Sequence, residues 1–215
     1  MIHYCEIEKT LSFLLWSWIL EPSPMEKQKN SSVWTEEGYR LFAKEGLYGI
    51  QVERLARILS LNKSGFYHYF GDIEGYCSAL VKLHVDKVGE FLQEVAVTKK
   101  LDPDYLHLLL KHREMIMFQV QLTRNSGNNS FYAASEIVDL KVSEGVRQLW
   151  CDYLEVSVNS DFGIRYYAIV RDMFYTRIPF QNLNFTFLHN LVTDAKKIMN
   201  AIGARKAFEA EESFH

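Results

Sequence analysis

The chain has 215 residues and a mass of 25.1 kDa, which is room for one medium domain or two small ones. Its 48% apolar and 24% charged residues exclude wholesale disorder, and its net charge of −3 excludes a bulk polyanion binder. Three widely spaced cysteines without a CxxC pair argue against a disulfide framework or a thiolate zinc site. They favour a reducing compartment, so we expect a cytoplasmic protein.

Residues 1–24 form a distinct N-terminal extension with a ten-residue apolar run from Leu11 to Leu20. Ten helical residues span about 15 Å, half the thickness of a bilayer core, so the run is too short to cross a membrane. Two glutamates and one lysine precede it, which is not the positive cluster of a signal peptide. Two interpretations stay open: an extra helix packed on the body, or a start-site artefact with translation beginning at Met25.

From Ser31 onward the apolar spacing predicts helices. Ser31 and Ser32 are favourable N-cap residues, and Gly46 is a typical C-terminal stop. Between them lies one apolar stripe: Val33, Trp34, Gly38, Leu41 and Phe42. A second short helix carries apolar residues spaced i, i+3, i+4 and i+7, namely Val52, Leu55, Ala56 and Leu59. The turn 60–62 ends it, and a third short helix is expected over 63–70.

The rest of the chain predicts long helices separated by short breaks. We expect them over about 72–97, 103–124, 131–158 (as one helix or two), 161–178 and 183–202. No segment has the period-2 alternation of a β-strand. The sequence therefore predicts an all-α protein.

A helix followed by two short helices, with a three-residue turn between these two, is the geometry of a helix-turn-helix DNA-binding unit. Five apolar residues are expected to lock the short helices together: Val52, Leu55, Ala56, Leu61 and Phe66. The last helix has a polar outer face that suits a major groove about 12 Å wide, formed by Lys63, Ser64, Tyr67, His68 and Tyr69. Gly65 would allow the backbone to approach the duplex. Spacing alone also fits two ordinary packed helices.

Three sequence blocks occur in order: EGYRLFAKEG (37–46), VERLA (52–56) and LNKSGFYHYF (61–70). Together they resemble the DNA-binding region of TetR/AcrR-type transcriptional regulators over roughly residues 31–85, and the F-Y-x-Y-F ending is the most specific part. The resemblance implies a helix-turn-helix domain at 25–71 and a helical ligand-sensing and dimerisation domain at 72–215. It also implies which residues face bases or the DNA backbone (Lys63, Ser64, Gly65, Tyr67 and His68) and which position phosphates (Gln51 and Tyr69).

Three positions depart from the family pattern. Gln51 replaces a frequent Thr, Ser60 replaces the Gly of the turn, and Ile73 replaces the Lys that commonly opens the fourth helix and contacts a phosphate. Each lost cationic phosphate contact lowers the salt dependence of binding by about one unit. We therefore expect DNA binding that is weaker or shifted in register.

Aromatic residues recur at helical spacing in the C-terminal two-thirds. They suit an apolar ligand pocket with a few polar groups, and ordinary core packing is the alternative for each of them. The candidate ligand-binding residues are Tyr105, Phe118, Trp150, Tyr153, Tyr167, Arg171 and Phe174. Further polar groups for such a pocket are His107, His112 and Arg165. Because Arg171 precedes Asp172 in an apolar stretch, either an internal ion pair or a pocket anchor would explain it.

Dimerisation is expected because one short recognition helix covers only half a site, and tight binding needs two about 34 Å apart. The last two helices carry apolar residues that could form a four-helix interface across a two-fold axis: Ile169, Met173, Leu188, Leu191 and Ile198. Packing within one chain is the alternative.

No catalytic motif is present: the chain lacks GxSxG, HExxH and a Gly-rich phosphate loop. We therefore expect no enzyme activity, cofactor, metal or membrane partner. The expected function is a homodimeric, ligand-responsive repressor that binds a palindromic DNA operator and an unidentified small-molecule effector. The competing hypothesis is a helical small-molecule-binding or protein-interaction module with a vestigial helix-turn-helix, which Gln51 and Ile73 favour.

Overall fold

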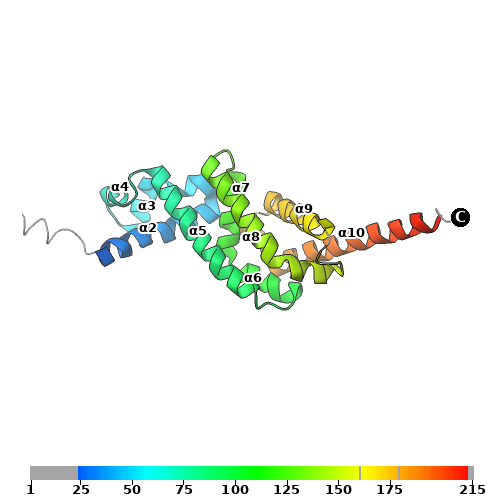
Figure 1. Ribbon diagram of the computed structural model, residues 1–215. Helices are drawn as coiled ribbons and strands as arrows, with labels where there is room; N and C mark the ends of the chain where they lie inside the picture. Colours follow the sequence, from blue (N-terminus) through cyan, green and yellow to red (C-terminus); the bar gives the residue numbers. More distant parts are fainter. Residues whose placement is uncertain (1–23, 160, 179, 213–215) are drawn as a thin grey trace, which may run out of the picture.

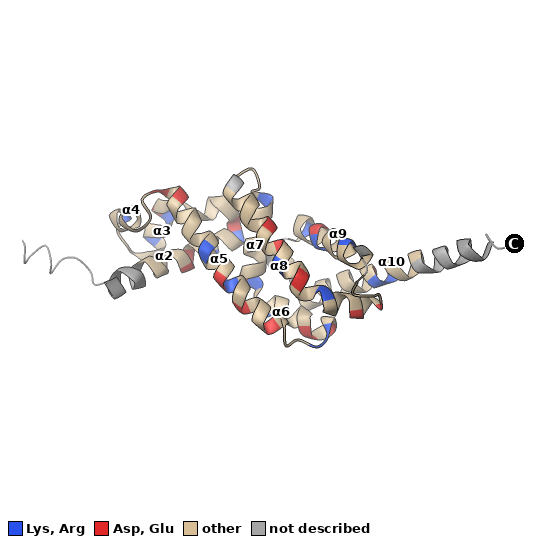
Figure 2. Cartoon of the chain, viewed as in Figure 1, with Lys and Arg blue, Asp and Glu red and all other residues tan. Residues whose placement is uncertain are grey.

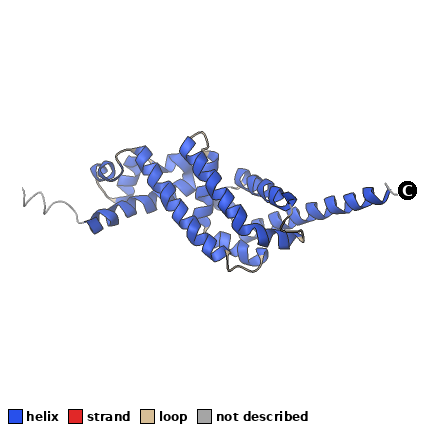
Figure 3. Ribbon diagram, in the orientation of Figure 1, coloured by secondary structure: helices blue, strands red, loops and turns tan. Residues whose placement is uncertain are grey.

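The computed structural model describes residues 24–159, 161–178 and 180–212, with side chains described over 31–202 except 129, 160, 161, 179 and 180. Within these residues the chain is all-α and contains no β-strand (Figures 1 and 3). The apolar run at 11–20, and with it both interpretations of the extension, lies outside the described residues. None of the described helices combines the length and apolar character that crossing a bilayer requires.

The N-terminal unit consists of α2 (Pro24–Glu45), the 3₁₀ turn η1 (Gly46–Ile50), α3 (Val52–Leu59) and α4 (Lys63–Phe70). The helices predicted at 52–59 and 63–70 are confirmed. The predicted start of the first helix at Ser31 is wrong, because the helix already begins at Pro24. Proline suits a first helical turn, where its missing N–H would have no partner, and the two serines lie inside the helix.

The body begins with the long helix α5 (Ile73–Val95) and ends with α10 (Phe185–Glu212). Between them lie the short turn η2 (Leu101–Tyr105), α6 (Leu106–Lys111), α7 (Arg113–Arg124), α8 (Asn129–Leu154), α9 (Asp161–Arg177) and η3 (Phe180–Asn182). The helix predicted over 103–124 is interrupted at His112, whose φ of −95° and ψ of 31° are not helical. The segment 131–158 proves to be one helix over most of its length.

The N-terminal unit lies at one end of the molecule and α10 extends at the other, with α5, α7 and α8 between them (Figure 1). Buried apolar side chains from Trp34 to Met199 form one continuous core. Helix α2 packs on the body as well as on the N-terminal unit. Tyr39 stacks on Phe118 of α7 with 4.2 Å between ring centroids, and Phe42 meets Phe131 of α8 with 5.4 Å between ring centroids. The expected boundary at 71/72 is thus a turn between α4 and α5 and not a break in packing.

Gly38 of α2 lies directly against the Tyr76 side chain of α5. A Cβ atom at this position would lie 1.7 Å from the hydroxyl oxygen of Tyr76. The Tyr76 side chain is fully buried, and its hydroxyl donates to the carbonyl oxygen of Trp34 at 2.6 Å. The absence of a side chain at Gly38 therefore permits the crossing that supports α4.

Candidate nucleic-acid interface and ligand cavity

The turn between α3 and α4 is three residues long and is held by the backbone. Ser60 adopts the left-handed conformation (φ 56°, ψ 37°), which favours glycine, and its N–H donates to the carbonyl of Arg57 at 3.3 Å. The Leu61 N–H donates to the carbonyl of Ala56 at 2.9 Å. The Asn62 side chain then caps α4 by accepting from the Ser64 N–H at 3.0 Å. The serine that replaces the expected glycine is therefore accommodated at a conformational cost.

Phe66 is the buried residue of α4 and fixes this helix to its neighbours. Its ring meets Trp34 of α2 edge-on at 5.5 Å and Tyr76 of α5 at 4.8 Å. Leu55 and Ala56 of α3 are also buried, as expected from the sequence. The expectation for Leu61 is wrong: its side chain is 41% exposed, because the left-handed turn at the preceding residue directs it away from the core.

The opposite face of α4 is exposed to solvent. Residues spaced i, i+1, i+4 and i+5 share it: Lys63, Ser64, Tyr67 and His68. Gln51 is exposed at the start of α3, and its side chain makes no capping bond. Tyr69 is half-buried and packs against the core, so part of its role is structural. The structure thus gathers four of the predicted DNA-contacting side chains of α4 on one surface.

Gly65 on α4 has no explanation in the packing of the chain. A Cβ atom at this position would meet only the Tyr69 ring, at an ordinary contact distance of 3.8 Å. Glycine within a helix costs about 0.5–1 kcal/mol of stability relative to alanine. The fold therefore does not require this glycine, whereas close approach by an external partner would.

The charges around this surface are already partly paired within the chain. The Lys63 ammonium lies 3.2 Å from the Glu53 carboxylate of α3, with both side chains more than half exposed. Hydrogen bonds from its own backbone N–H and from Lys63 lower the pKa of Glu53. Arg54 pairs with Glu45, and Arg57 is exposed on α3. Along α5 and α8, charges of both signs are interspersed (Figure 2).

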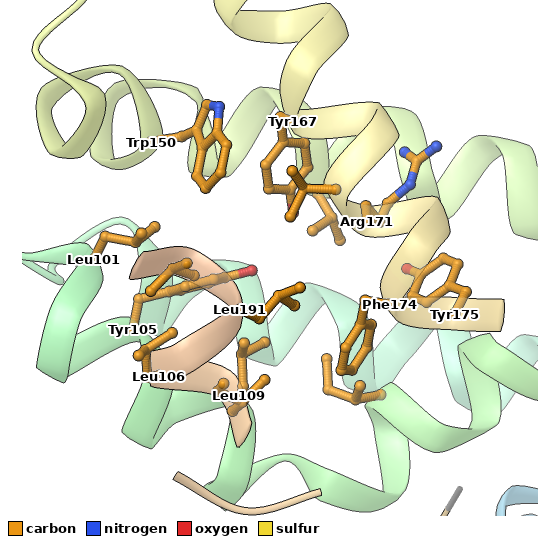
Figure 4. A pocket seen from close by; sticks show the side chains of 15 residues that line it. Leu101, Tyr105, Leu106, Leu109, Trp150, Tyr167, Arg171, Phe174, Tyr175 and Leu191 are labelled. Carbon is orange, nitrogen blue, oxygen red and sulfur yellow. The ribbon is translucent and has the colours of Figure 1, made fainter. Parts of the chain in front are cut away.

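A second candidate site is a small apolar cavity in the body, lined by residues of η2, α6, α7, α8, α9 and α10, with a volume of about 80 Å³ (Figure 4). Five of the seven expected ligand-binding residues line it: Tyr105, Trp150, Tyr167, Arg171 and Phe174. Tyr175, which follows Arg171 by one helical turn, also lines it. Sites for drug-sized ligands typically measure roughly 300–1,000 Å³. A ligand of more than a few atoms would therefore have to displace part of the lining.

The other two expected ligand-binding residues lie elsewhere. Phe118 is on the face of α7 that packs on α2 and α5, where its ring stacks against Tyr39 at 4.2 Å and against His84 at 4.7 Å. Tyr153 lies under the Lys196 ammonium of α10, 5.1 Å from it, and is not among the cavity-lining residues. Helical spacing placed both on apolar faces, and the neighbouring helices determine which face borders the cavity.

The further polar groups expected in the pocket are also placed. His107 stacks on Phe185 at 4.7 Å, and the His112 Nε2 lies 2.9 Å from the Glu94 carboxylate. Neither histidine is among the cavity-lining residues. Arg165 is not among them either, and it is exposed on α9.

The structure shows Arg171 in an internal ion pair, the first of the two alternatives; its role as a pocket anchor stays a prediction. Its side chain lines the cavity, and its guanidinium group points away from the cavity centre (Figure 4). This group pairs with Asp172 at 2.9 Å and with Asp139 of α8 at 3.7 Å, and it donates to the Ser143 hydroxyl at 3.2 Å. Burial raises the pKa of Asp139, and the Arg171 charge opposes that rise.

A chain of buried hydrogen bonds joins this cavity to α2. The Asp139 carboxylate accepts from the Tyr175 hydroxyl at 2.9 Å and from the Gln119 amide at 2.8 Å. Because that amide nitrogen is the donor, the Gln119 oxygen accepts from His84 Nε2 at 2.9 Å. His84 Nδ1 then accepts from the Tyr39 hydroxyl, also at 2.9 Å. We call these five residues the polar chain.

Sequence reasoning missed the central members of the polar chain, His84, Gln119 and Asp139. One signal was present: His84 occupies an apolar stripe of α5, four residues after Leu80 and four before Val88. A histidine at such a position needs hydrogen-bond partners from other helices. Those partners come from residues 35 and 45 positions away, so the sequence pattern could not identify them.

The buried His84 should make stability depend on pH. Burial lowers its pKa to about 4, so the unfolded state, with an ordinary value near 6.5, takes up the proton first as the pH falls. The stability that the neutral, buried His84 contributes is therefore complete above about pH 6.5, and it is lost as the pH falls towards 4. Between pH 7 and 4 we expect the unfolding free energy of the wild type to fall by about 3 kcal/mol more than that of His84→Gln. Urea titrations at both pH values measure this, and equal losses would contradict it.

Comparison with known proteins does not identify the chain. No model of a protein family matches it, and no curated protein matches it. Among the described residues, no three His, Cys, Asp or Glu side chains gather in a way that could hold a metal ion.

Proposed function

We propose that the chain is a DNA-binding transcriptional regulator of the TetR/AcrR type, acting in the cytoplasm as a ligand-responsive, homodimeric repressor. The observation that carries the proposal is α4, which is anchored by Phe66 on one side and presents Lys63, Ser64, Tyr67 and His68 on the other. Eight helical residues are about 12 Å long, and a major groove is about 12 Å wide, so α4 suits insertion into it.

Gly65 supports the same proposal from a different direction. An alanine here would fit the fold, so the glycine is best explained by a duplex backbone pressed against α4. The paired Lys63 also fits this function, because its exposed ion pair with Glu53 is weak and a DNA phosphate can replace the carboxylate. The remaining electrostatic attraction is modest, which agrees with the absence of a lysine at Ile73.

The proposed dimer interface lies on α9 and α10. Apolar side chains on these helices that are between 39% and 55% exposed in the single chain include Ile169, Met173, Ile198 and Ile202. Burying them between two copies would remove apolar surface from water. Leu188 is only 2% exposed and belongs to the core, so it packs within its own chain and is unsuited to the interface. Leu191 is half-buried and also lines the cavity.

The proposed effector site is the cavity. Its lining is apolar and aromatic, and the nearby guanidinium of Arg171 is paired with Asp139 and Asp172. This environment suits an apolar ligand with a few hydrogen-bonding groups. The ligand can regulate DNA binding only if its affinity differs between the DNA-binding and the released conformations.

The alternative is a helical small-molecule-binding or protein-interaction module whose helix-turn-helix is vestigial. Two observations favour it. Ile73, at the start of α5, is 44% exposed where a phosphate-binding lysine is expected, and Lys63 is partly neutralised by Glu53.

Binding to DNA distinguishes the two functions. The full chain is used to select genomic fragments, and the recovered sequence is then titrated by fluorescence anisotropy over a salt series. We expect two protomers per site and an affinity that falls steeply with salt. The double variant Lys63→Ala/Tyr67→Ala should lose this binding and keep its helical circular dichroism spectrum. If the selection recovers no preferred sequence, the module is supported instead.

Replacing Gly65 by alanine should separate folding from DNA binding. We expect the unfolding free energy to rise by about 0.5–1 kcal/mol, because alanine favours the helix. DNA affinity should fall by about tenfold or more, because the new methyl group meets the duplex. The matched control is Gly89→Ala on α5, an exposed position where a Cβ meets nothing within 4 Å. That variant should be similarly stabilised with unchanged affinity, and equal affinities for both variants would remove Gly65 from the interface.

A further inference from the structure

The polar chain crosses the molecule from the cavity to the N-terminal unit. It begins at Tyr175 on α9, passes through Asp139 on α8, Gln119 on α7 and His84 on α5, and ends at Tyr39 on α2. We propose that the polar chain couples occupancy of the cavity to the position of α2, and that α2 in turn affects the exposed face of α4. The regulatory meaning of this coupling rests on the proposed function.

The hydrogen bonds of the chain depend on one another. Gln119 donates to both the Asp139 carboxylate and the Ser135 carbonyl, which fixes the direction of its amide group. The carbonyl end of that amide then requires a proton on His84 Nε2, and this leaves Nδ1 as the acceptor for Tyr39. His84, Gln119 and Asp139 are all buried, so a partner that moves away is not replaced by bulk water.

The cavity end of the chain is placed to respond to a ligand. Tyr175 and Arg171 line the cavity, and both contact the Asp139 carboxylate. Because the cavity measures only about 80 Å³, a larger ligand has to move part of its lining, and these two residues of α9 belong to that lining. A ligand that moves them acts directly on Asp139. The Asp139 carboxylate would then lose a partner and shift with the Gln119 amide, which holds His84.

The other end of the polar chain, Tyr39, lies on α2 near Trp34, which packs against α4. Tyr39 follows Trp34 on α2 by five residues, and Trp34 packs edge-on against Phe66 of α4 at 5.5 Å. A change in the hydrogen bond between Tyr39 and His84 therefore alters the helix on which α4 rests. Ring stacking between Tyr39 and Phe118 is a second link between α2 and α7, so an experiment has to separate the hydroxyl from the ring.

The test uses fluorine NMR of the full chain labelled with 5-fluorotryptophan. Trp150 lines the cavity and Trp34 reports on the N-terminal unit. The chain has four tryptophans, so Trp16→Phe, Trp18→Phe and Trp150→Phe assign three resonances and leave that of Trp34. The perturbation is Tyr175→Phe, which removes only the hydroxyl that bonds to Asp139. The matched control is Tyr166→Phe. The Tyr166 hydroxyl donates to the Ala195 carbonyl and takes no part in the polar chain, and the Tyr166 ring lies 6.0 Å from that of Trp150.

We expect both substitutions to shift the Trp150 resonance and only Tyr175→Phe to shift that of Trp34 by more than its linewidth. In a Tyr39→Phe background, which keeps the ring stacking and removes the last hydrogen bond, Tyr175→Phe should no longer shift Trp34. The proposal is overturned if Trp34 stays unmoved in the single variant, if it moves equally in the Tyr39→Phe background, or if the control moves it as far. Neither DNA nor ligand is present, so failure to bind DNA would contradict the proposed function and leave this result standing.

Discussion

Replacing Gly38 by alanine is expected to destabilise the protein by about 3 kcal/mol, the upper end of what overpacking a core typically costs and a large part of the 5–15 kcal/mol typical of a folded domain. The new Cβ would lie 1.7 Å from the Tyr76 hydroxyl and 2.6 Å from the ring carbon that bears it. Neither helix can yield easily, because Tyr76 is fully buried and also contacts Phe66 and Phe70. The tyrosine ring has to leave its site, and its burial and its hydrogen bond to Trp34 are lost. Urea unfolding followed by circular dichroism measures the effect.

Gly89→Ala is the matched control for this substitution. Gly89 lies in the middle of α5, is exposed, and has open space where a Cβ would be. Alanine here should stabilise the protein by about 0.5–1 kcal/mol. The two glycine-to-alanine changes therefore have opposite expected signs, and the same sign for both would show that the α2–α5 crossing is less close than described.

Replacing Phe66 by alanine should cost about 3–5 kcal/mol. Phe66 is fully buried, and no other residue of α4 is, so this ring contributes most of the buried attachment of α4, beside the contact of Phe70 with Tyr76. Besides the cavity it leaves, the substitution removes the edge-on contacts with Trp34 and Tyr76. Thermal or urea unfolding monitored by tryptophan fluorescence measures the loss.

The neighbouring Tyr67→Ala isolates this effect. Tyr67 is 52% exposed, so its removal should change stability by no more than about 0.5 kcal/mol. On the proposed function it should instead abolish DNA binding. A large loss of stability in Tyr67→Ala, or a small one in Phe66→Ala, would mean that α4 is anchored differently.

The fold could be predicted best where local signals were sufficient. The helices 52–59 and 63–70 have short apolar patterns bounded by a turn and an asparagine cap, and their limits agree with the structure. The start of α2 and the break at His112 were missed. At the first, two serines competed with an upstream proline as the N-terminal signal. At His112, the neighbours in sequence all favour a helix, and the bond to the Glu94 carboxylate comes from another helix, so the local pattern gave no sign of the break.

The sites were predictable to different degrees. The exposed face of α4 follows from helical spacing, because Phe66 fixes which side is buried and the others follow. The cavity depends on how α6, α8, α9 and α10 pack, so Phe118 and Tyr153 could not be separated from the five residues that line it. The polar chain depends entirely on contacts between helices distant in sequence.

The core shared between the N-terminal unit and the body has a consequence for protein engineering. Tyr39 and Phe42 are completely buried, and their aromatic partners include Phe118 and Phe131 of the body. A fragment cut at residue 71 would expose these rings and lose the other half of its core. A chimaera that gives this body another N-terminal unit therefore needs an α2 surface that matches α7 and α8, and the two parts are not freely interchangeable modules.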